Sequence, residues 1–275
     1  MFLPMMLLEA RTEPFNHEDY MFEPKFNGIR LQWIQRNGEI SLYTRHETLI
    51  TNRFPELTES LFPFDSLTLD GELIAMNPET GLEDFELIMR RFHLRSPDRS
   101  IPVAFMVFDC LWQDGDIRRA PHYERRQLLE HLPLLPPFQL VPSLEEEGIR
   151  IWEAVTERDM EGMVAKRKNS TYVGKRSGDW LKVIRWKMVN AFIVSVRTYP
   201  FAVYCVSEEG EGLGLVEFGF DPVHKKALRG ILPSITKHQN EDWIQLTTGI
   251  PCVLKSRGYT SSGKLFTPVF EDFIL

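Results

Sequence analysis

Apolar and polar positions alternate in several short runs along the first two thirds of the chain, and a period of two predicts β-strands. Leu31–Gln35 and Glu39–Tyr43 are two such runs. Between them lies Asn37-Gly38, a dipeptide typical of a tight hairpin turn. Two further runs, Leu67–Met76 and Val103–Leu111, predict additional strands. Strands therefore dominate this part of the predicted fold.

Helical spacing of apolar residues is less common. The windows Phe85–Phe92 and Tyr123–His131 predict helices, and the proline-rich segment Pro133–Pro142 interrupts regular structure. We therefore expect a region of mixed α and β structure in which strands outnumber helices.

A third helix is predicted from its start signal. Ser143 followed by Glu146 has the spacing of a capping box, so we expect a helix to begin there and to end near Asp159. A strand over Gly162–Arg167 would follow at once. The apolar positions of the predicted helix are Leu144, Ile151, Trp152 and Val155.

The pattern changes near residues 187–190. Four strand-like runs and one helical window, Val223–Leu232, occupy the last 85 or so residues. Short strands with a single helix in this length suit a small barrel such as the OB-fold. We therefore predict two domains, 1–188 and 189–275. The strand-like runs are Phe192–Thr198, Ala202–Val206, Leu215–Phe220 and Cys252–Lys255.

Composition excludes several classes of protein. The odd number of cysteines (Cys110, Cys205 and Cys252) and the absence of a CxxC pair argue against a disulfide framework or structural zinc. No run approaches the roughly 18 apolar residues of a membrane span, and the apolar start is too short for a signal peptide. We expect a soluble cytoplasmic protein that does not contact membranes.

The net charge of −7 argues against a surface that binds polyanions everywhere, but the charge is unevenly distributed. Residues 166–187 contain eight Lys or Arg and one acid, a local sum of +7, so the rest of the chain totals −14. Tyr172, Trp180 and Trp186 are interleaved with these cations. Cations mixed with aromatic side chains favour a phosphate or nucleic-acid partner over a merely solvated surface.

Three shorter clusters could also carry chemistry. Residues 23–30 place Lys25 after a proline and before a glycine, residues 70–72 pair two acids, and Phe108-Asp109 ends an apolar run. Taken alone, each cluster also has an ordinary structural interpretation: residues 23–30 as a loop, residues 70–72 as a turn and Phe108-Asp109 as part of a core strand. Their order along the chain is more informative than any one of them.

In that order the clusters resemble motifs I, III, IIIa, IV and V of the covalent nucleotidyltransferases, which are DNA ligases, RNA ligases and capping enzymes. Arg45 and Phe54-Pro55-Glu56-Leu57 strengthen the likeness to bacterial and phage ATP-dependent DNA ligases and to the ligase module of bacterial end-joining enzymes. The five motifs are Lys25-x-Asn27-Gly28-x-Arg30, Asp70-Gly71-Glu72, Phe108-Asp109, Glu161-Gly162-x-x-x-Lys166 and Trp180-Leu181-Lys182.

This resemblance implies an α+β fold in which an ATP-grasp-like nucleotidyltransferase domain with antiparallel sheets precedes an OB-fold barrel. It also implies three steps. Lys25 attacks the α-phosphate of ATP, AMP passes to the 5′-phosphate of nicked duplex DNA, and the 3′-hydroxyl displaces AMP. Lysine is almost entirely protonated at pH 7, so we expect cations such as Lys182 and a divalent ion near Lys25.

The resemblance assigns roles residue by residue. The catalytic set would be Lys25, Lys166 and Lys182, the last two at the α-phosphate. Mg²⁺ or Mn²⁺ would be held by Glu161 and Glu72. The nucleotide contacts would be Glu23, Arg30, Arg45, Glu72 (ribose), Phe108 (stacked on adenine), Lys166, Lys182 and Lys187. Contacts to DNA or phosphate would be Arg30, Arg45, Arg167, Lys175, Arg176 and Arg185.

Three positions depart from the family pattern. Asn27 stands where aspartate is usual, Ile184 replaces a lysine, and Phe266 replaces an arginine of motif VI, which leaves Arg257 and Lys264 as substitutes. The departures keep two alternatives open: an RNA ligase or capping-type enzyme, and a decayed relative that binds nicks or nucleotide without chemistry. As a DNA ligase, the chain is expected to act as a monomer with separate end-joining or repair proteins.

Overall fold

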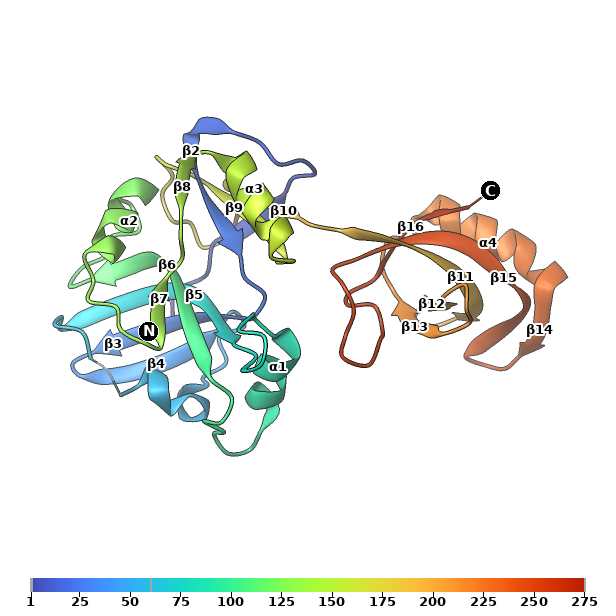
Figure 1. Cartoon of the computed structure of the whole chain (residues 1–275), viewed down its shortest axis with the longest axis horizontal. Coiled ribbons are helices and arrows are strands. Elements are labelled where there is room, and N and C mark those ends of the chain that lie inside the picture. The colour runs from blue at the N-terminus through green and yellow to red at the C-terminus, as the bar shows by residue number, and fades with distance from the viewer. Residues whose placement is uncertain (1, 60, 275) are drawn as a thin grey trace. The chain divides into compact units, whose positions relative to one another are not determined.

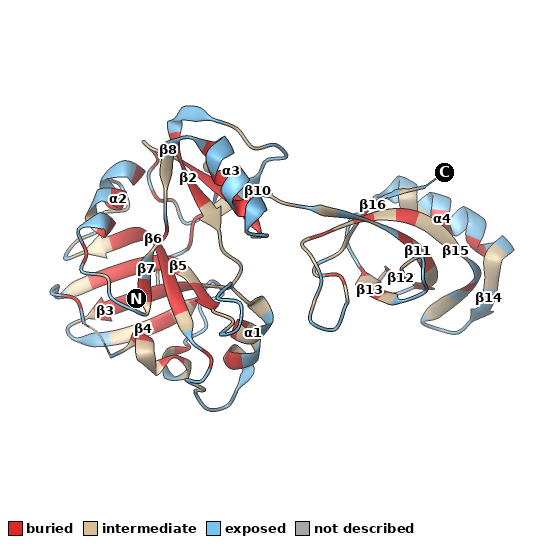
Figure 2. Cartoon of the chain, viewed as in Figure 1, coloured by how far each residue is buried: buried red, intermediate tan, exposed pale blue. Residues whose placement is uncertain are grey.

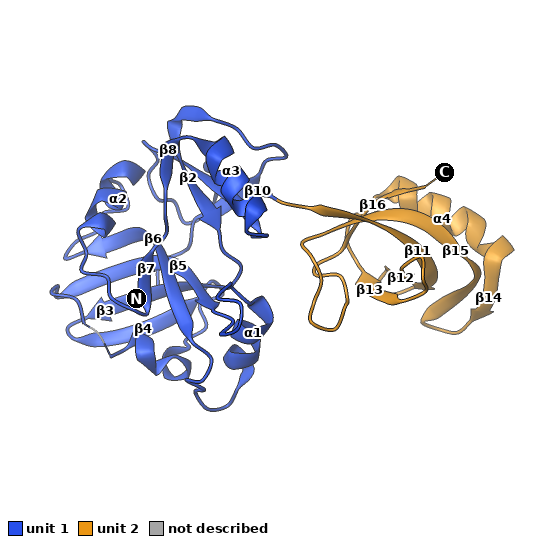
Figure 3. Cartoon of the chain, viewed as in Figure 1, with its two compact units in different colours: residues 1–184 blue, residues 185–275 orange. Residues whose placement is uncertain are grey.

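Two compact units make up the chain, residues 1–184 and 185–275, four residues before the boundary predicted above (Figure 3). The computed structural model describes residues 2–59 and 61–274 (Figure 1). Within these ranges, no helix has the length and apolar character needed to cross a membrane. The three cysteines are buried and free.

The first unit contains two five-stranded sheets. One has the order β1 (Leu7–Ala10), β10 (Arg176–Ile184), β9 (Gly162–Arg167), β2 (His17–Lys25) and β8 (Leu144–Glu146). The other has the order β4 (Glu39–Thr44), β3 (Ile29–Arg36), β5 (Ser66–Ala75), β6 (Val103–Gln113) and β7 (Phe138–Leu140). Antiparallel sheets were predicted, and most strand pairs are antiparallel, but each sheet also has one parallel pair, β1 with β10 and β6 with β7, so both sheets are mixed.

A third sheet forms the second unit, and all its strand pairs are antiparallel. Its order is β13 (Gly212–Val216), β12 (Ala202–Val206), β11 (Lys187–Arg197), β15 (Trp243–Ser256) and β14 (Thr236–Gln239), and β16 (Val269–Phe273) also pairs with β15. The predicted strand Leu215–Phe220 was placed too late, because the chain leaves the sheet after Val216. The core of the second unit is an apolar cluster that includes Leu228 and Leu232 of α4 (Pro222–Ile235).

The hairpin at Asn37-Gly38 is confirmed. Asn37 has a φ of 49° and Gly38 a φ of 81°, which are the left-handed values that a type I′ turn requires. β3 and β4 pair in register up to Arg36 and Glu39 on either side of this turn.

Helices α1 (Phe85–His93) and α2 (His122–Glu130) agree with the two predicted windows and pack on β5 and β6 respectively. The capping-box prediction was wrong, because the segment that was expected to open a helix forms strand β8 instead. Leu144 pairs with Phe22 of β2, and α3 (Gly148–Glu157) begins two residues after Glu146 with no side-chain cap. A long-range strand pairing therefore overrides the local helix signal. Two short 3₁₀ turns cover Thr51–Arg53 and Pro55–Leu57.

Aromatic side chains fill the larger core of the first unit. Trp33, Phe62, Phe105 and Phe138 are buried there, and ring pairs among them meet edge to face with centroids 5.3–5.9 Å apart. Figure 2 shows long buried stretches along β3, β5 and β6. Edge-to-face packing is a favoured geometry for aromatic rings. This core supports the sheet that carries β3, β5 and β6.

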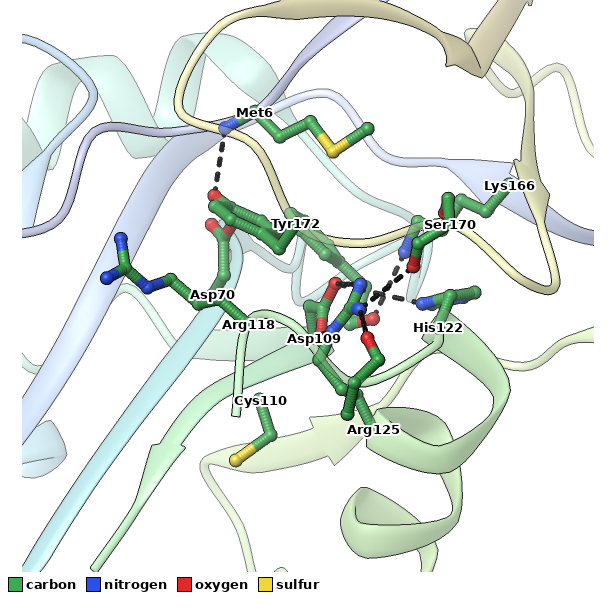
Figure 4. A network of polar contacts seen from close by, with 12 residues as sticks. Met6, Asp70, Asp109, Cys110, Arg118, His122, Arg125, Lys166, Ser170 and Tyr172 are labelled. Carbon is green, nitrogen blue, oxygen red and sulfur yellow. Dashed lines mark hydrogen bonds and ion pairs between the residues drawn. The ribbon is translucent and has the colours of Figure 1, made fainter. Parts of the chain in front are cut away.

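A buried polar network lies beside this core (Figure 4). Arg125 of α2 donates to both carboxylate oxygens of Asp109, at 2.8 and 2.9 Å, and both side chains are fully buried. Burial opposes ionisation of Asp109, but the charge and hydrogen bonds of Arg125, together with His122, hold the pKa of this carboxyl well below its usual range. Arg125 also donates to the Ser170 carbonyl, at 3.1 Å. The network therefore ties α2 to β6 and to the loop after β9.

Asp109→Asn should cost about 3–5 kcal/mol of unfolding free energy, because it leaves the buried Arg125 charge without a counter-ion. Asp116→Asn is the matched control, since it breaks the more exposed Asp116–Arg118 pair and should cost less than about 1 kcal/mol. Urea denaturation of both variants measures the difference. Equal losses in the two variants would contradict the role given to the buried pair.

Candidate active site

An ion pair joins the end of β2 to the start of β9. Lys25 Nζ lies 2.7 Å from Glu161 Oε2, and the Glu161 side chain is only 4% exposed. The two strands bring these residues together because Lys25 pairs with Gly162 in the antiparallel register. The sequence predicted cations beside Lys25, whereas the contact observed here is with a carboxylate.

Lys25 lies at the edge of a largely apolar pocket between the two sheets of the first unit. The ring of Phe108 meets Trp180 edge to face, with centroids 6.2 Å apart. Most predicted nucleotide-binding residues converge here. The pocket is lined by Leu8, Glu23, Pro24, Lys25, Phe26, Arg30, Glu72, Phe108, Val141, Val164, Lys166 and Trp180.

A second ion pair lies at the base of this pocket. Lys166 Nζ is 2.7 Å from Glu23 Oε2 and donates to the Phe108 carbonyl at 3.1 Å. Both side chains are almost completely buried, and Nζ is 4.4 and 4.6 Å from the ring centroids of Phe108 and Trp180. Burial lowers the pKa of Lys166, and the neighbouring Glu23 partly offsets this effect.

Arg30 closes one side of the pocket. It donates to both carboxylate oxygens of Asp70, at 3.0 and 2.7 Å, and its guanidinium lies 4.9 Å from the Phe108 ring centroid. The Tyr172 hydroxyl donates to the same carboxylate at 2.6 Å, and this pair is drawn in Figure 4. Arg30 is therefore held in place by buried partners before any ligand arrives.

Backbone amides of motif I are bound by two carboxylates. The Asn27 N–H donates to Glu83 at 3.1 Å and the Gly28 N–H donates to Glu72 at 3.2 Å. A side chain at Gly28 would place its Cβ 2.2 Å from the Leu73 carbonyl oxygen, so only glycine fits at this position. Burial raises the pKa of Glu72 and of Glu83 to about 7 in each case, although Lys25 opposes the shift at both.

A wider, more polar groove adjoins the apolar pocket and shares Leu8, Lys25, Arg30 and Glu72 with it. Predicted phosphate contacts from three separate elements gather along it. These are Arg30 on β3, Arg45 after β4, and Arg176 and Lys182 on β10. The groove is thus lined by cations that lie far apart in the sequence.

Other predicted residues lie outside these two cavities. Arg167 pairs with Asp19 and Asp179, at 3.1 and 3.3 Å, and Lys175 is exposed. Four residues belong to the second unit, and their predicted roles stay predictions: Arg185, Lys187, Arg257 and Lys264.

Sequence reasoning missed several contributors to the site. Trp180 and Asp70 lie within recognised motifs, so the motif pattern already contained their signal. Glu83 lies in a polar loop between β5 and α1, where a carboxylate is ordinarily a solvated side chain. No local pattern distinguishes it from its neighbour Glu79.

The fold matches solved DNA ligase structures. The chain superposes on a structure titled "DNA binding with a minimal scaffold: Structure-function analysis of Lig E DNA ligases" with a TM-score of 0.70, 20% identity and complete coverage of both chains. A mycobacterial DNA ligase D complexed with ATP and MES aligns with a TM-score of 0.61 and 21% identity, over 99% of this chain and 95% of that one. At this level of identity the likeness concerns the fold.

Sequence comparison identifies the family. Residues 5–183 match the model of the ATP-dependent DNA ligase domain. The SPbeta prophage-derived DNA ligase-like protein LigB of Bacillus subtilis is 33% identical over 99% of each chain. The multifunctional non-homologous end joining protein LigD of Mycolicibacterium smegmatis is 31% identical over 67% of this chain, which spans about a quarter (24%) of that relative. This chain belongs to the ATP-dependent DNA ligase family.

Proposed function

We propose that this chain seals nicks in duplex DNA in three steps, with Lys25 as the residue that carries AMP. The Nζ of Lys25 bonds to the α-phosphorus of ATP as the bond to pyrophosphate breaks. The 5′-phosphate of the nick then takes the AMP from Lys25, and the 3′-hydroxyl displaces AMP to form the phosphodiester. The position of Lys25, where the apolar pocket meets the cation-lined groove, is the observation that carries the proposal.

The apolar pocket suits an adenine base. Phe108 and Trp180 offer aromatic surface, and Glu23 and Lys166 offer a buried acceptor and donor. Adenine has a flat face that packs on aromatic rings and edges that carry hydrogen-bond donors and acceptors, so a pocket with apolar walls and a few polar groups suits it. The contacts of Lys166 with two rings and Glu23 favour a role at the base over the α-phosphate role expected from the sequence. Glu72 is proposed at the ribose.

The groove suits phosphates. Phosphoryl transfer spreads negative charge over oxygen atoms, so the protein mainly positions and neutralises these atoms. We assign Lys182 to the α-phosphate, and Arg45 and Arg176 to nucleotide or nick phosphates. Arg30 would hold phosphate from the rim, with its orientation fixed by Asp70.

The carboxylates near Lys25 suit Mg²⁺ or Mn²⁺. Glu161 and Glu72 interact electrostatically across the site, and carboxylate oxygens are hard ligands. Among the described residues, no three His, Cys, Asp or Glu side chains converge to hold a metal by themselves. Mg²⁺ ordinarily combines one or two carboxylates with water and substrate phosphates, so these residues fit it. When bound, the ion would neutralise charge on the departing pyrophosphate.

The second unit is proposed as an OB-fold, with 189–275 as its domain and 1–188 as the nucleotidyltransferase domain. Support comes from its two sheet edges. Phe218, just after β13, bridges to Val269 of β16, and the Leu265 N–H donates to the Leu213 carbonyl at 2.9 Å. Contacts that join opposite edges are typical of small closed barrels.

The oligomeric state and the partner proteins complete the proposal. We propose that the chain acts as a monomer. The LigD relative is a multifunctional non-homologous end joining protein, so we propose separate end-joining proteins as partners of this chain.

Lys25→Ala should abolish covalent labelling by α-labelled ATP with Mg²⁺, because the AMP acceptor is gone. It should still seal a nick that carries AMP on its 5′-phosphate beforehand, because that step does not use the lysyl adduct. Gel autoradiography and a sealing assay measure the two activities. Labelling of the variant would overturn the assignment, and a wild-type protein that never labels would favour the decayed relative.

A nicked DNA duplex should be sealed faster than the same nick built from RNA strands. Asn27 is the observation that keeps an RNA-sealing activity as the second candidate. Single-turnover sealing with both duplexes, at matched sequence and salt, separates the two candidates. A faster rate on RNA would replace the DNA assignment with the RNA one.

Glu72→Gln should stabilise the metal-free, nucleotide-free protein by about 1–2 kcal/mol at pH 8, with a smaller effect at pH 5. The folded pKa of about 7 lies above the usual glutamate value. Between the usual glutamate pKa and about 7, Glu72 is ionised in the unfolded state but still protonated in the folded state, so the free energy of unfolding falls as the pH rises. Glutamine does not ionise, so the variant does not lose this stability. Melting temperatures of both proteins at the two pH values measure the effect. An equal difference at both pH values would show that Glu72 titrates normally.

A further inference from the structure

Glu83 is a carboxylate near the proposed nucleophile that none of the motifs contains. It lies on the loop between β5 and α1, and its Oε2 accepts the backbone N–H of Asn27 at 3.1 Å. Asn27 is two residues from Lys25. A side chain from a different part of the chain thus holds the motif I loop directly.

The backbone around Glu83 fixes its position. The Asn77 N–H donates to the Leu82 carbonyl at 2.8 Å, and the Asp84 N–H donates to the Ala75 carbonyl at 2.9 Å. Residue 83 also bridges to Met76 beyond the end of β5, and Asp84 caps α1 by accepting the Leu87 N–H. Glu83 is therefore anchored on both sides by β5 and α1.

The charge of Glu83 acts on the same groups as the two motif carboxylates. Lys25, Glu161 and Glu72 are all within its electrostatic reach. Burial raises the pKa of Glu83, and the hydrogen bond from Asn27 opposes that rise. Partial burial of the Glu83 carboxylate costs desolvation free energy. An exposed residue of the same loop, such as Glu79, has no such cost.

Position 27 lacks the negative charge that motif I usually carries there. Asparagine keeps the size of aspartate but not its charge, so the family arrangement would otherwise lose one anion beside Lys25. The backbone of the same residue is the group that Glu83 binds.

We propose that Glu83 is a positioning residue that supplies the carboxylate missing at position 27, and that it holds the motif I loop and the charge balance around Lys25. This inference rests on the proposed function, since it concerns formation of the lysyl-AMP adduct. Glu83 is then a third acidic side chain within electrostatic reach of Lys25, beside Glu161 and Glu72, and it comes from a different loop.

The test relocates the charge. Glu83→Gln should slow adduct formation from α-labelled ATP by about tenfold, because the charge of the carboxylate is lost and the Asn27 N–H then donates to a neutral amide oxygen, a weaker acceptor. The double variant Asn27→Asp/Glu83→Gln should return the rate to within about threefold of wild type. Glu79→Gln, which removes the same charge from the exposed part of the loop, is the matched control and should leave the rate unchanged.

Rapid-quench measurement of adduct formation at pH 8, above the Glu83 pKa of about 7, gives the rates, and melting temperatures show that each variant folds. A folded Glu83→Gln protein with a rate within about twofold of wild type would overturn the proposal. Failure of Asn27→Asp to restore the rate would also overturn it, because a purely structural defect is not repaired by moving a charge. If Glu83→Gln does not fold, the double variant decides alone. A wild-type protein that forms no adduct would instead overturn the proposed function.

Discussion

The contact between Lys25 and Glu161 is the constraint on which the rest of the site depends. It exists because β2 and β9 pair in a register that sets Lys25 opposite Gly162, next to Glu161. An ammonium held by a carboxylate is well placed but is not yet a nucleophile, since the attacking nitrogen needs a free electron pair. The Glu161 carboxylate therefore fixes where the Lys25 amine lies, next to the apolar pocket.

Buried charges recur throughout the first unit, and each is paired. Arg30 is held by Asp70, Arg125 by Asp109 and Lys166 by Glu23. Pairs of this kind contribute little net stability, because desolvation of the two ions offsets their attraction. Their value here is orientation: the pairs of Arg30 and Lys166 fix side chains that line the apolar pocket, and the Arg125–Asp109 pair, which lies outside that lining, ties α2 to β6. A preorganised polar site needs no rearrangement as charge moves during phosphoryl transfer.

Motif order predicted the family and a set of residues that the fold brings together, since Lys25, Glu72 and Phe108 all line the apolar pocket. Local patterns also predicted the Asn37-Gly38 hairpin, which depends only on its own backbone. Ser143 does not begin a helix, because the next residue, Leu144, pairs with β2, about 120 residues earlier in the chain, and the segment becomes a strand. Glu83 could not be predicted, since its importance arises from a contact with Asn27 across 56 residues.

Lys25 is the residue that we propose carries the AMP. Mass-spectrometric mapping of proteolytic peptides after incubation with ATP and Mg²⁺ tests this assignment directly, because the adduct is covalent and its position can be read from the fragments. We expect a single AMP adduct on the peptide that contains Lys25, with none on the peptides that contain Lys166 or Lys182. An adduct on either of those lysines, with Lys25 unmodified, would contradict the assignment.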